Sequence, residues 1–318
     1  MAEPLLSIQN LSKRFRTERG TVHAVTDVSL DIARGSITGL VGESGSGKTT
    51  LGRALLRLIE PSEGSVWFDG AELTTLAPRE MVAMRKRMQI IFQDPVSSLN
   101  PRLKVEAIVA EGLVAHRIGR RGERRERVAA LLEEVGLSAD HMARYPHEFS
   151  GGQRQRIGIA RALALEPEFI VADESVSALD VSIQAQILNL LLDLRARRDL
   201  TMLFIAHDLS VVDYLCDRIA VMYLGRVVET GPARAVYRSP AHPYTQALLS
   251  AVPKPDPRAP REREILQGTI PSPLDPPSGC VFRTHCPRMT PDCARIVPPG
   301  FATGPDRIAH CINLPQAS

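Results

Sequence analysis

The stretch Gly42-Glu-Ser-Gly-Ser-Gly-Lys-Thr-Thr50 decides the fold of this chain, and it stands between an apolar run and a helical pattern. All fixed positions of the pattern G-x-x-x-x-G-K-S/T are present: Gly42, Gly47, Lys48 and Thr49. The glycines let the backbone bend until its N–H groups, and the N-terminus of the helix that follows, face the phosphates of a nucleotide. Lys48 adds a positive charge and Thr49 a hydroxyl ligand for Mg²⁺. The sequence therefore predicts a strand, a phosphate-binding loop and a helix.

The size and composition of the chain are those of a folded protein. Its 318 residues are enough for one α/β domain and something smaller, and 44% of them are hydrophobic, which is enough for a buried core. The apolar stretches fall short of the ~20 residues that cross a bilayer, and Met1–Asn10 lacks a signal pattern, so we expect the chain to stay in the cytoplasm. A net charge of +3 and 4% aromatic residues do not indicate nucleic acid binding.

Periodicity predicts a series of strands and helices around the loop. Strands are expected at 5–11, 22–32, 65–68, 88–92, 169–172 and 201–206, and helices at 48–59, 150–165 and 181–198, with a helical insert over 103–136. A polar turn is expected between the first two strands and contains Phe15, which is either a core residue or an exposed ring able to stack on a base. The basic run 117–127 is interpreted as a solvated face, with anionic lipid contact as the alternative.

Polar side chains follow three of the predicted buried strands. They are Gln93, the pair Asp173 and Glu174, and His207. Ligands of open α/β sheets bind at the carboxyl ends of strands, so these positions are candidates for one site. A carboxylate such as Asp173 suits Mg²⁺, and Glu174 is placed to orient or deprotonate water.

A second glycine-containing helix start occurs at Ser150-Gly-Gly-Gln153. Ser150 is a good N-cap residue. A serine and two glycines before a helix are also typical of a site that binds an anion through backbone N–H groups, as in the first loop.

These motifs, in this order and with Ser177-Ala-Leu-Asp180 after Asp173-Glu174, resemble the ATPase subunit of an ATP-binding-cassette (ABC) transporter over residues 5 to about 250. The resemblance implies an α/β fold: a P-loop NTPase cassette with a RecA-like sheet core, an antiparallel β layer and a helical subdomain at about 95–160. It also implies that two cassettes enclose two ATP molecules, each between the phosphate loop of one subunit and the SGGQ motif of the other.

The resemblance also implies a role for each motif residue. Phe15 would stack on adenine, and the phosphates and Mg²⁺ would be held by Gly42, Ser44, Gly45, Gly47, Lys48, Thr49 and Thr50. Gln93 would sense Mg²⁺ and water, Asp173 would ligate Mg²⁺, and Glu174 would be the general base. His207 would contact the γ-phosphate. The partner's ATP and the interface would be reached by Ser150, Gly151, Gly152, Gln153 and Asp180.

Two positions depart from the family pattern. Phe149 stands where leucine usually precedes SGGQ, and Ser175 replaces the proline that usually follows Asp-Glu. Neither change removes a catalytic group, so they concern local loop geometry.

Three further stretches, 93–101, 178–186 and 239–248, resemble the ATPases of bacterial oligopeptide and dipeptide importers, a family that also includes nickel and glutathione importers. The expected partners are a second cassette, suggested by the family to be a paralogue, two transmembrane permease subunits and, indirectly, a solute-binding protein, but no nucleic acid. The expected location is the cytoplasmic face of the inner membrane, as a peripheral subunit. A soluble cassette protein acting on DNA or ribosomes is the alternative from another class.

The C-terminal residues 253–318 form a separate extension of the cassette at 1–252. They contain 14 of the 24 prolines and four cysteines: Cys280, Cys286, Cys293 and Cys311. So short a segment usually needs disulfides or a metal to become ordered, and a four-thiolate metal site contributes on the order of 10 kcal/mol. Similarity to importers with a cysteine-rich tail suggests a 4Fe-4S cluster, with zinc as the runner-up and four unrelated buried cysteines as the remaining alternative.

Overall fold

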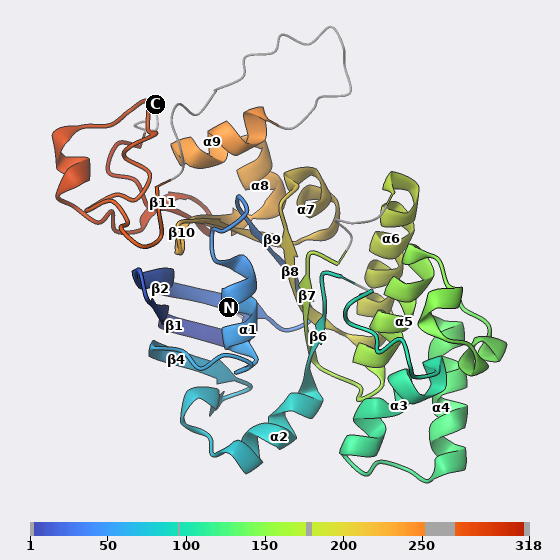
Figure 1. Cartoon of the computed structure of the whole chain (residues 1–318). Helices are drawn as coiled ribbons and strands as arrows, with labels where there is room; N and C mark the ends of the chain where they lie inside the picture. Colours follow the sequence, from blue (N-terminus) through green and yellow to red (C-terminus); the bar gives the residue numbers. More distant parts are fainter. Residues whose placement is uncertain (1–2, 95, 176–179, 252–270, 315–318) are drawn as a thin grey trace, which may run out of the picture. The chain divides into compact units, whose positions relative to one another are not determined.

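The computed structural model describes residues 3–94, 96–175, 180–251 and 271–314. The chain divides into two compact units: a first unit, made of residues 1–75 and 204–318, and a second unit, made of residues 76–203. Figure 1 shows strands and helices in both units, as the α/β expectation requires. No helix in the described part of the chain is long and apolar enough to cross a membrane.

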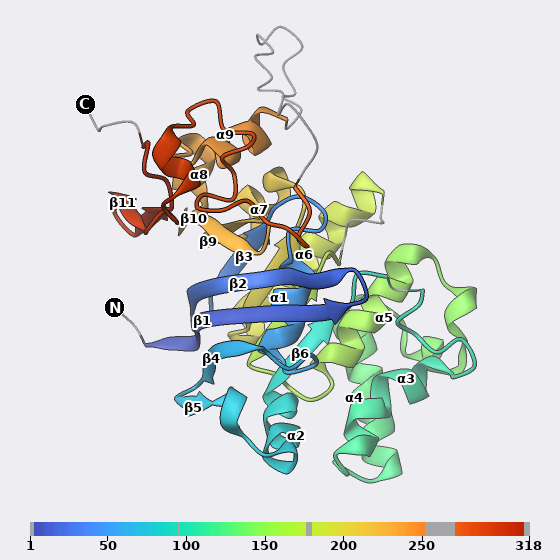
Figure 2. The same ribbon diagram turned by 60° about the vertical axis from the view of Figure 1, so that its left-hand side comes forward.

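The first unit contains a four-stranded antiparallel sheet in the order β2-β1-β4-β5. Its strands are β1 (Pro4–Thr17), β2 (Gly20–Ala33), β4 (Glu63–Phe68) and β5 (Ala71–Glu72). The long pair of β1 and β2 is prominent in Figure 2. Leu6 and Ile8 of β1 and Phe68 of β4 are fully buried and give this sheet an apolar face.

The predicted turn around Phe15 is wrong. β1 continues through this residue, Phe15 pairs with Val22 of β2, and the chain turns only between Thr17 and Gly20. The charges that suggested a loop alternate with half-buried residues: Arg14 and Arg16 are exposed, as expected for the outer face of a strand.

A second sheet of the first unit has β11, β12, β10, β9 and β3 as successive neighbours. β3 (Ile37–Val41) is buried throughout and runs parallel to β9 (Arg218–Tyr223). β10 (Arg226–Pro232) pairs with β9 and with β12 (Arg307–Ala309), which pairs with β11 (Phe301–Gly304), all antiparallel. The helices of this unit are α1 (Lys48–Leu55), α7 (Leu209–Leu215), α8 (Ala233–Arg238) and α9 (Pro243–Ser250), and a 3₁₀ turn, η1, covers Leu73–Thr75.

The second unit is mainly helical around two parallel strands, β6 (Met88–Ile91) and β7 (Phe169–Asp173). Its helices are α2 (Pro78–Arg87), α3 (Val105–Ala115), α4 (Arg121–Glu134), α5 (Gly151–Leu163) and α6 (Val181–Arg198), with 3₁₀ turns η2 (Ala139–Ala143) and η3 (Pro146–Glu148). The helical pattern over 103–136 is broken into two helices at Arg117 and Gly119, both of which have positive φ. β8 (Thr201–Ala206) is fully buried, and along the chain the second unit ends within it, at Leu203.

The described part of the C-terminal extension is ordered by joining the second sheet of the first unit, which the sequence did not predict. Ala309 of β12 pairs with Glu229 of β10, and the backbone N–H of His310 donates to the carbonyl of Val228 at 2.8 Å. Besides β11 and β12, this region (271–314) has one 3₁₀ turn, η4 (Pro291–Ala294), in agreement with its lack of helical periodicity. The hairpin lies beside β10 in Figure 1.

A buried ion pair fixes the hairpin to the sheet. Glu229 is fully buried, and its carboxylate accepts hydrogen bonds from the backbone N–H groups of Ala241 and His242, each at 2.9 Å. The guanidinium of Arg307 lies 3.3 Å from the same carboxylate and also donates to the carbonyl of Ser239. One carboxylate therefore joins β10, the loop before α9 and the C-terminal hairpin.

Replacing Arg307 by leucine is expected to lower the free energy of unfolding of the protein by about 3 kcal/mol, because it leaves the buried charge of Glu229 without its cation. The control is Arg34→Leu, which breaks an ion pair with Asp69 whose side chains are 47% and 39% exposed, and which should cost less than about 1 kcal/mol. Denaturant unfolding measures both. Equal losses would show that the Arg307 pair contributes no more than a surface contact.

Candidate nucleotide-binding site

The phosphate loop follows β3 in the first unit, and close backbone contacts dictate its glycines. Gly42 has φ 155° and Gly47 has φ 102°. A Cβ atom at Gly42 would lie 2.1 Å from the carbonyl oxygen of Met222, and one at Gly47 would lie 2.1 Å from that of Ala24. Gly45 also has a positive φ, of 80°, but a Cβ atom there would meet nothing within 4 Å. Two of the three glycines are therefore required by space as well as by backbone conformation.

Lys48 begins α1 and is 4% exposed. Its ammonium group donates to the carbonyl oxygens of Gly42 and Glu43, at 2.8 and 2.9 Å. The N-cap of α1 is Gly47, which offers no side-chain hydrogen bond to the first turn. A positive charge and uncapped N–H groups at a helix N-terminus are the features that bind phosphate. Ser44 is exposed at the tip of the loop, and Thr49 and Thr50 are half-buried in the first turn.

Two neighbouring segments hold the loop in place. The N–H of Gly225, between β9 and β10, donates to the carbonyl of Ser46 at 2.9 Å, and the N–H of Thr26 in β2 donates to the carbonyl of Gly225 at 2.8 Å. The N–H of Glu43 donates to the hydroxyl of Tyr244 at 3.0 Å. From the sequence, the stretch that contains Tyr244 was identified only by its resemblance to importer ATPases, and its contact with the loop was not predicted.

The other candidates of the first unit are Phe15 and His207. Phe15 is half-buried in β1, with the ammonium of Lys13 4.9 Å from the centre of its ring. His207 directly follows β8 and is exposed. Adenine stacking by Phe15 and γ-phosphate contact by His207 stay predictions.

In the second unit, the structure brings Gln93 and Glu174 together. Parallel pairing aligns Ile91 of β6 with Ala172 of β7, so the residues two positions further on lie at the same edge. The side-chain amide of Gln93 donates to a carboxylate oxygen of Glu174 at 2.7 Å. Asp173 ends β7 and is 1% exposed. The sequence-based expectation that strand ends gather polar residues is thus confirmed for this pair.

The backbone of Glu174 is strained, with φ at 42°. A left-handed conformation at a residue other than glycine costs of order 1–3 kcal/mol and is often found at functional sites. Ser175, which departs from the family pattern, is 2% exposed, and its hydroxyl has no hydrogen-bond partner among the described residues.

Ser150 is the N-cap of α5, as predicted. Its hydroxyl accepts from the N–H of Gln153, and the side chain of Gln153 accepts from the N–H of Ser150 at 3.0 Å, which is a complete capping box. Gly151 is exposed, whereas Gly152 is buried, and a Cβ atom there would lie 2.5 Å from a methyl group of Ile183 in α6. Packing against α6 therefore requires Gly152.

The neighbouring motif is described only in part. Asp180 occupies the N-cap position of α6, is exposed and makes no capping hydrogen bond. Ser177, Ala178 and Leu179, on which the interface motif also depends, lie outside the described residues.

The four C-terminal cysteines lie near one another but do not form a metal site in this structure. Burial, and then the proximity of the other three thiols, raises the pKa of Cys280 to about 11, and burial also raises the pKa of Cys286 and of Cys311. Within residues 271–314 and the rest of the described chain, no group of three or more histidine, cysteine, aspartate or glutamate side chains could hold a metal ion. The donor chemistry fits a thiolate-bound metal, but the observed arrangement does not support the predicted cluster.

The C-terminal extension contacts the surroundings of the phosphate loop through Phe282, which is 1% exposed. Its ring centre lies 5.3 Å from that of Tyr223 and 5.4 Å from that of Tyr244. Burial raises the pKa of Glu43 in the loop, and the nearby charges of His285 and Lys48 oppose this shift. The sequence offered no signal for these contacts, because Phe282 stands alone in a proline-rich segment.

A glycine loop leading into a helix with a buried lysine, and a buried strand that ends in Asp-Glu beside a glutamine, define a P-loop nucleoside triphosphatase. Residues 25–177 match the ABC transporter family, and residues 228–293 match the family "Oligopeptide/dipeptide transporter, C-terminal region". The chain belongs to the ABC transporter family and is one of its ATP-hydrolysing cassettes.

Curated relatives resemble the whole chain. A putative peptide import ATP-binding protein of Brucella ovis is 59% identical over 98% of this chain and 98% of its own length. A putative oligopeptide transport ATP-binding protein of Bacillus subtilis is 53% identical over 97% of this chain and 95% of its own length.

Solved cassettes share the fold. A cassette of the cbiONQ transporter complex of Clostridium perfringens has a TM-score of 0.67 and 29% identity, and the match covers 74% of this chain and 92% of that one. A dimeric cassette in a post-hydrolysis state, bound to ADP and Pi, has a TM-score of 0.66 and 30% identity, covering 72% and 99%. The ABC cassette fold predicted from the motifs is confirmed.

Replacing Gly47 by alanine is expected to weaken nucleotide binding at least tenfold, because the new Cβ atom would collide with the carbonyl of Ala24 and displace the loop. The matched control is Gly45→Ala, which costs only the strain of a positive φ, about 1–2 kcal/mol of stability, and should keep most of the affinity. Titration with a fluorescent ATP analogue measures both. Equal losses would mean that backbone conformation, and not close approach, requires the glycines.

Proposed function

We propose that the chain is the ATP-hydrolysing subunit of a membrane importer of oligopeptides or dipeptides. The observation that carries the ATPase chemistry is the hydrogen bond from Gln93 to Glu174 at the carboxyl ends of two parallel strands. The cargo is suggested by relatives whose names describe peptide import and by the C-terminal family match. Nickel or glutathione as cargo of the same kind of importer is the alternative.

Residues of both units would take part in hydrolysis. Lys48 and the N–H groups of the phosphate loop bind the β- and γ-phosphates. Glu174 orients and deprotonates the attacking water, and Gln93 fixes the position of its carboxylate. Thr49, Gln93 and Asp173 would supply oxygen ligands, which suit the hard cation Mg²⁺. When bound, Mg²⁺ neutralises charge on the phosphate oxygens.

Two cassettes would close around two ATP molecules. Ser150, Gly151, Gly152 and Gln153 of one chain would contact ATP on the phosphate loop of the other, His207 would contact the γ-phosphate, and Phe15 the adenine. Asp180 would transmit the state of one site across the interface. ATP binding closes the pair and pulls on the membrane subunits through the loop that follows Gln93, and hydrolysis allows the pair to reopen.

The assembly follows from the same proposal. The chain would pair with a second cassette, a paralogue, and sit peripherally on two transmembrane permease subunits at the cytoplasmic face of the inner membrane, supplied by a solute-binding protein. Residues 1–252 would form the ATP-binding domain, with a helical subdomain at about 95–160, and residues 253–318 its C-terminal extension.

Replacing Glu174 by glutamine is expected to leave ATP binding intact and to slow turnover by about 10²–10⁴-fold, because the amide keeps the hydrogen bond with Gln93 but cannot accept a proton. The control is Glu166→Gln, a change at the surface pair with Arg127 in the same unit, where the glutamate side chain is 68% exposed. Phosphate release and calorimetric ATP titration measure the two steps. Full hydrolysis by the Glu174 variant would show that another group is the base.

The transport part of the proposal is tested by what the Glu174→Gln protein retains from detergent-solubilised native membranes in the presence of ATP. We expect two multi-spanning proteins, a second cassette and a peptide-binding protein. Recovery of ribosomes or DNA-repair proteins, with no membrane partner, would overturn the importer proposal and leave the ATPase chemistry standing.

We further propose that Cys280, Cys286, Cys293 and Cys311 bind a 4Fe-4S cluster with a structural role, with zinc as the alternative. In support, the thiols are close enough to shift one another's pKa, and Cys293 accepts a hydrogen bond from the side-chain amide of Asn313 at 3.3 Å. Binding would require the thiols to rearrange and lose their protons.

Anaerobically purified protein is expected to contain about four iron and four sulfide ions per chain. Cys293→Ser should lose them, while Cys216→Ser, at a buried cysteine outside the cluster, should not. Protein that contains neither iron nor zinc would refute the metal site.

A further inference from the structure

A cavity of about 480 Å³ in the first unit lies apart from the phosphate loop, and Cys280 of the proposed cluster is among the residues that line it. It lies between β2, β10 and the C-terminal extension, and its polar lining includes Asn10, Asp27, Ser29, Arg226, His242 and His310. Its volume equals that of roughly 16 water molecules and falls within the range of small-molecule sites.

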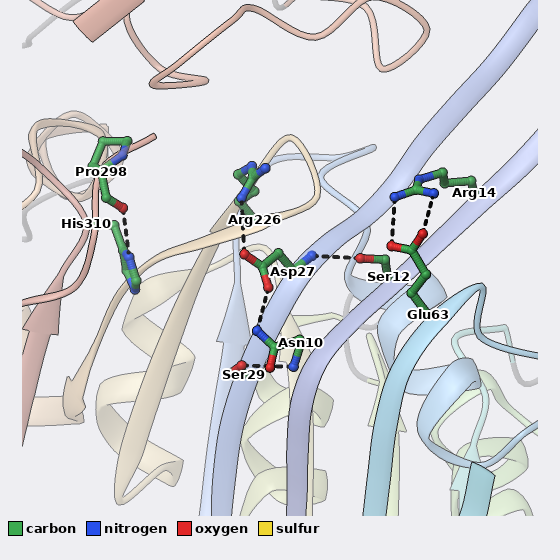
Figure 3. A network of polar contacts seen from close by, with 9 residues as sticks. All are labelled: Asn10, Ser12, Arg14, Asp27, Ser29, Glu63, Arg226, Pro298 and His310. Atoms are coloured by element: carbon green, nitrogen blue, oxygen red, sulfur yellow. Dashed lines mark hydrogen bonds and ion pairs between the residues drawn. The ribbon is translucent and has the colours of Figure 1, made fainter. Parts of the chain in front are cut away.

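Asp27 and Arg226 are the charged groups of the lining, and their partners are shown in Figure 3. The side-chain amide of Asn10 donates to one oxygen of Asp27 at 2.8 Å, and the guanidinium of Arg226 lies 4.0 Å from the other. That distance is too long for a direct hydrogen bond, and the Arg226 side chain makes no other polar contact among the residues the structure describes. Both groups therefore keep hydrogen-bonding capacity for a ligand.

Two histidines also line the cavity, and burial lowers the pKa of His242 to about 3, so its imidazole is uncharged at neutral pH. His310 donates from Nδ1 to the carbonyl of Pro298 at 3.3 Å, which leaves Nε2 for a ligand. One positive and one negative charge in the lining match a zwitterion better than a simple anion or cation.

The remaining lining is apolar and faces solvent in part. Val297 is 51% exposed and Ile308 is 44% exposed, and Val281 and two prolines, Pro298 and Pro299, complete this wall. A ligand with an aliphatic side chain would cover apolar surface that is otherwise in contact with water.

The turn between β9 and β10 contacts the phosphate loop and also leads into the wall of the cavity. Arg226 directly follows Gly225, whose N–H donates to Ser46 in the loop, and Asp27 directly follows Thr26, whose N–H donates to Gly225. A ligand that draws Arg226 and Asp27 together therefore acts on a segment that supports the loop.

We propose that this cavity binds a small zwitterion with an α-ammonium group, a carboxylate and an aliphatic side chain, namely a free amino acid or a dipeptide, and that its binding is coupled to nucleotide binding. The carboxylate pairs with Arg226, the ammonium group with Asp27 and His310, and the side chain packs on Val297 and Ile308. Neither the ATPase activity nor the cargo of the transporter is needed for this assignment.

The test is calorimetric titration of the full-length protein with L-leucine and, separately, with leucyl-leucine. We expect saturable binding of at least one of them, and the stronger of the two identifies the source of the zwitterion. N-acetyl-leucine and leucine amide, each lacking one charge, should bind at least tenfold more weakly.

Arg226→Gln and Asp27→Asn should each weaken binding at least tenfold. Asparagine, like aspartate, tolerates the positive φ of 53° at position 27, so that variant keeps the backbone. The matched control is Arg14→Gln, a change in the same β1–β2 sheet. Arg14 pairs with Glu63 outside the cavity (Figure 3), so its loss should leave the affinity for the ligand unchanged.

Saturating ligand should change the affinity for ATP at least threefold, and ATP should change the affinity for the ligand by the same factor, because coupling between two sites is reciprocal. Absence of binding, or equal binding by the Arg226 variant and wild type, would overturn the site. Binding without any effect on ATP affinity would overturn the coupling and leave the site in place.

Discussion

The phosphate loop takes its path because Gly42 and Gly47 let its backbone pass directly beside two other backbone segments. The carbonyls of Met222 and Ala24 occupy the space that a side chain would need. This contact makes β2, the turn between β9 and β10, and the loop one packed group, to which Gly225 adds its hydrogen bond to Ser46. β10 leaves that turn and pairs with β9 and with β12 of the C-terminal hairpin.

In the second unit, the register of two parallel strands determines which polar side chains meet. Pairing of β6 with β7 aligns Ile91 with Ala172. Gln93 and Glu174 follow two positions later, and although they are 81 residues apart in sequence, the amide of one lies 2.7 Å from the carboxylate of the other. Glu174 also has a left-handed backbone conformation, with φ at 42°. The capping box of Ser150 and Gln153 likewise shows that a motif predicted to contact nucleotide also begins a helix.

Much of the fold could be predicted because local signals were strong. The phosphate loop has a complete motif between β3 and α1, β7 is a short apolar run, and α6 has an apolar stripe. The polar strand ends predicted that Gln93 and Glu174 lie at one edge of the sheet, where they share a hydrogen bond. Phe15 was misplaced because charged residues on the outer face of a long strand resemble a turn in one dimension. The contact of Tyr244 with Glu43 joins residues 201 positions apart, for which single-sequence periodicity contains no information.

For the C-terminal cysteines the sequence specified less, and for a different reason. Their spacing indicated shared chemistry, and they do lie near one another, but a spacing does not specify the directions in which thiols point. The segment obtains its order from the sheet instead, through β12 and the pair of Arg307 with Glu229. The sequence of the segment alone does not identify a partner that belongs to another part of the chain.

The buried carboxylate of Glu229 has a consequence for how the protein is made. Its cation is 78 residues further along the chain, so on the ribosome the strand that contains Glu229 is synthesised well before Arg307. At synthesis rates of about 5–20 residues per second, several seconds separate the two. Residues 1–75 of the first unit are synthesised first. The whole of the second unit follows before the remaining strands of the first unit are made. This unit is therefore completed only after the whole of the second unit has been synthesised, and until then its sheet lacks the edge strands of the C-terminal hairpin.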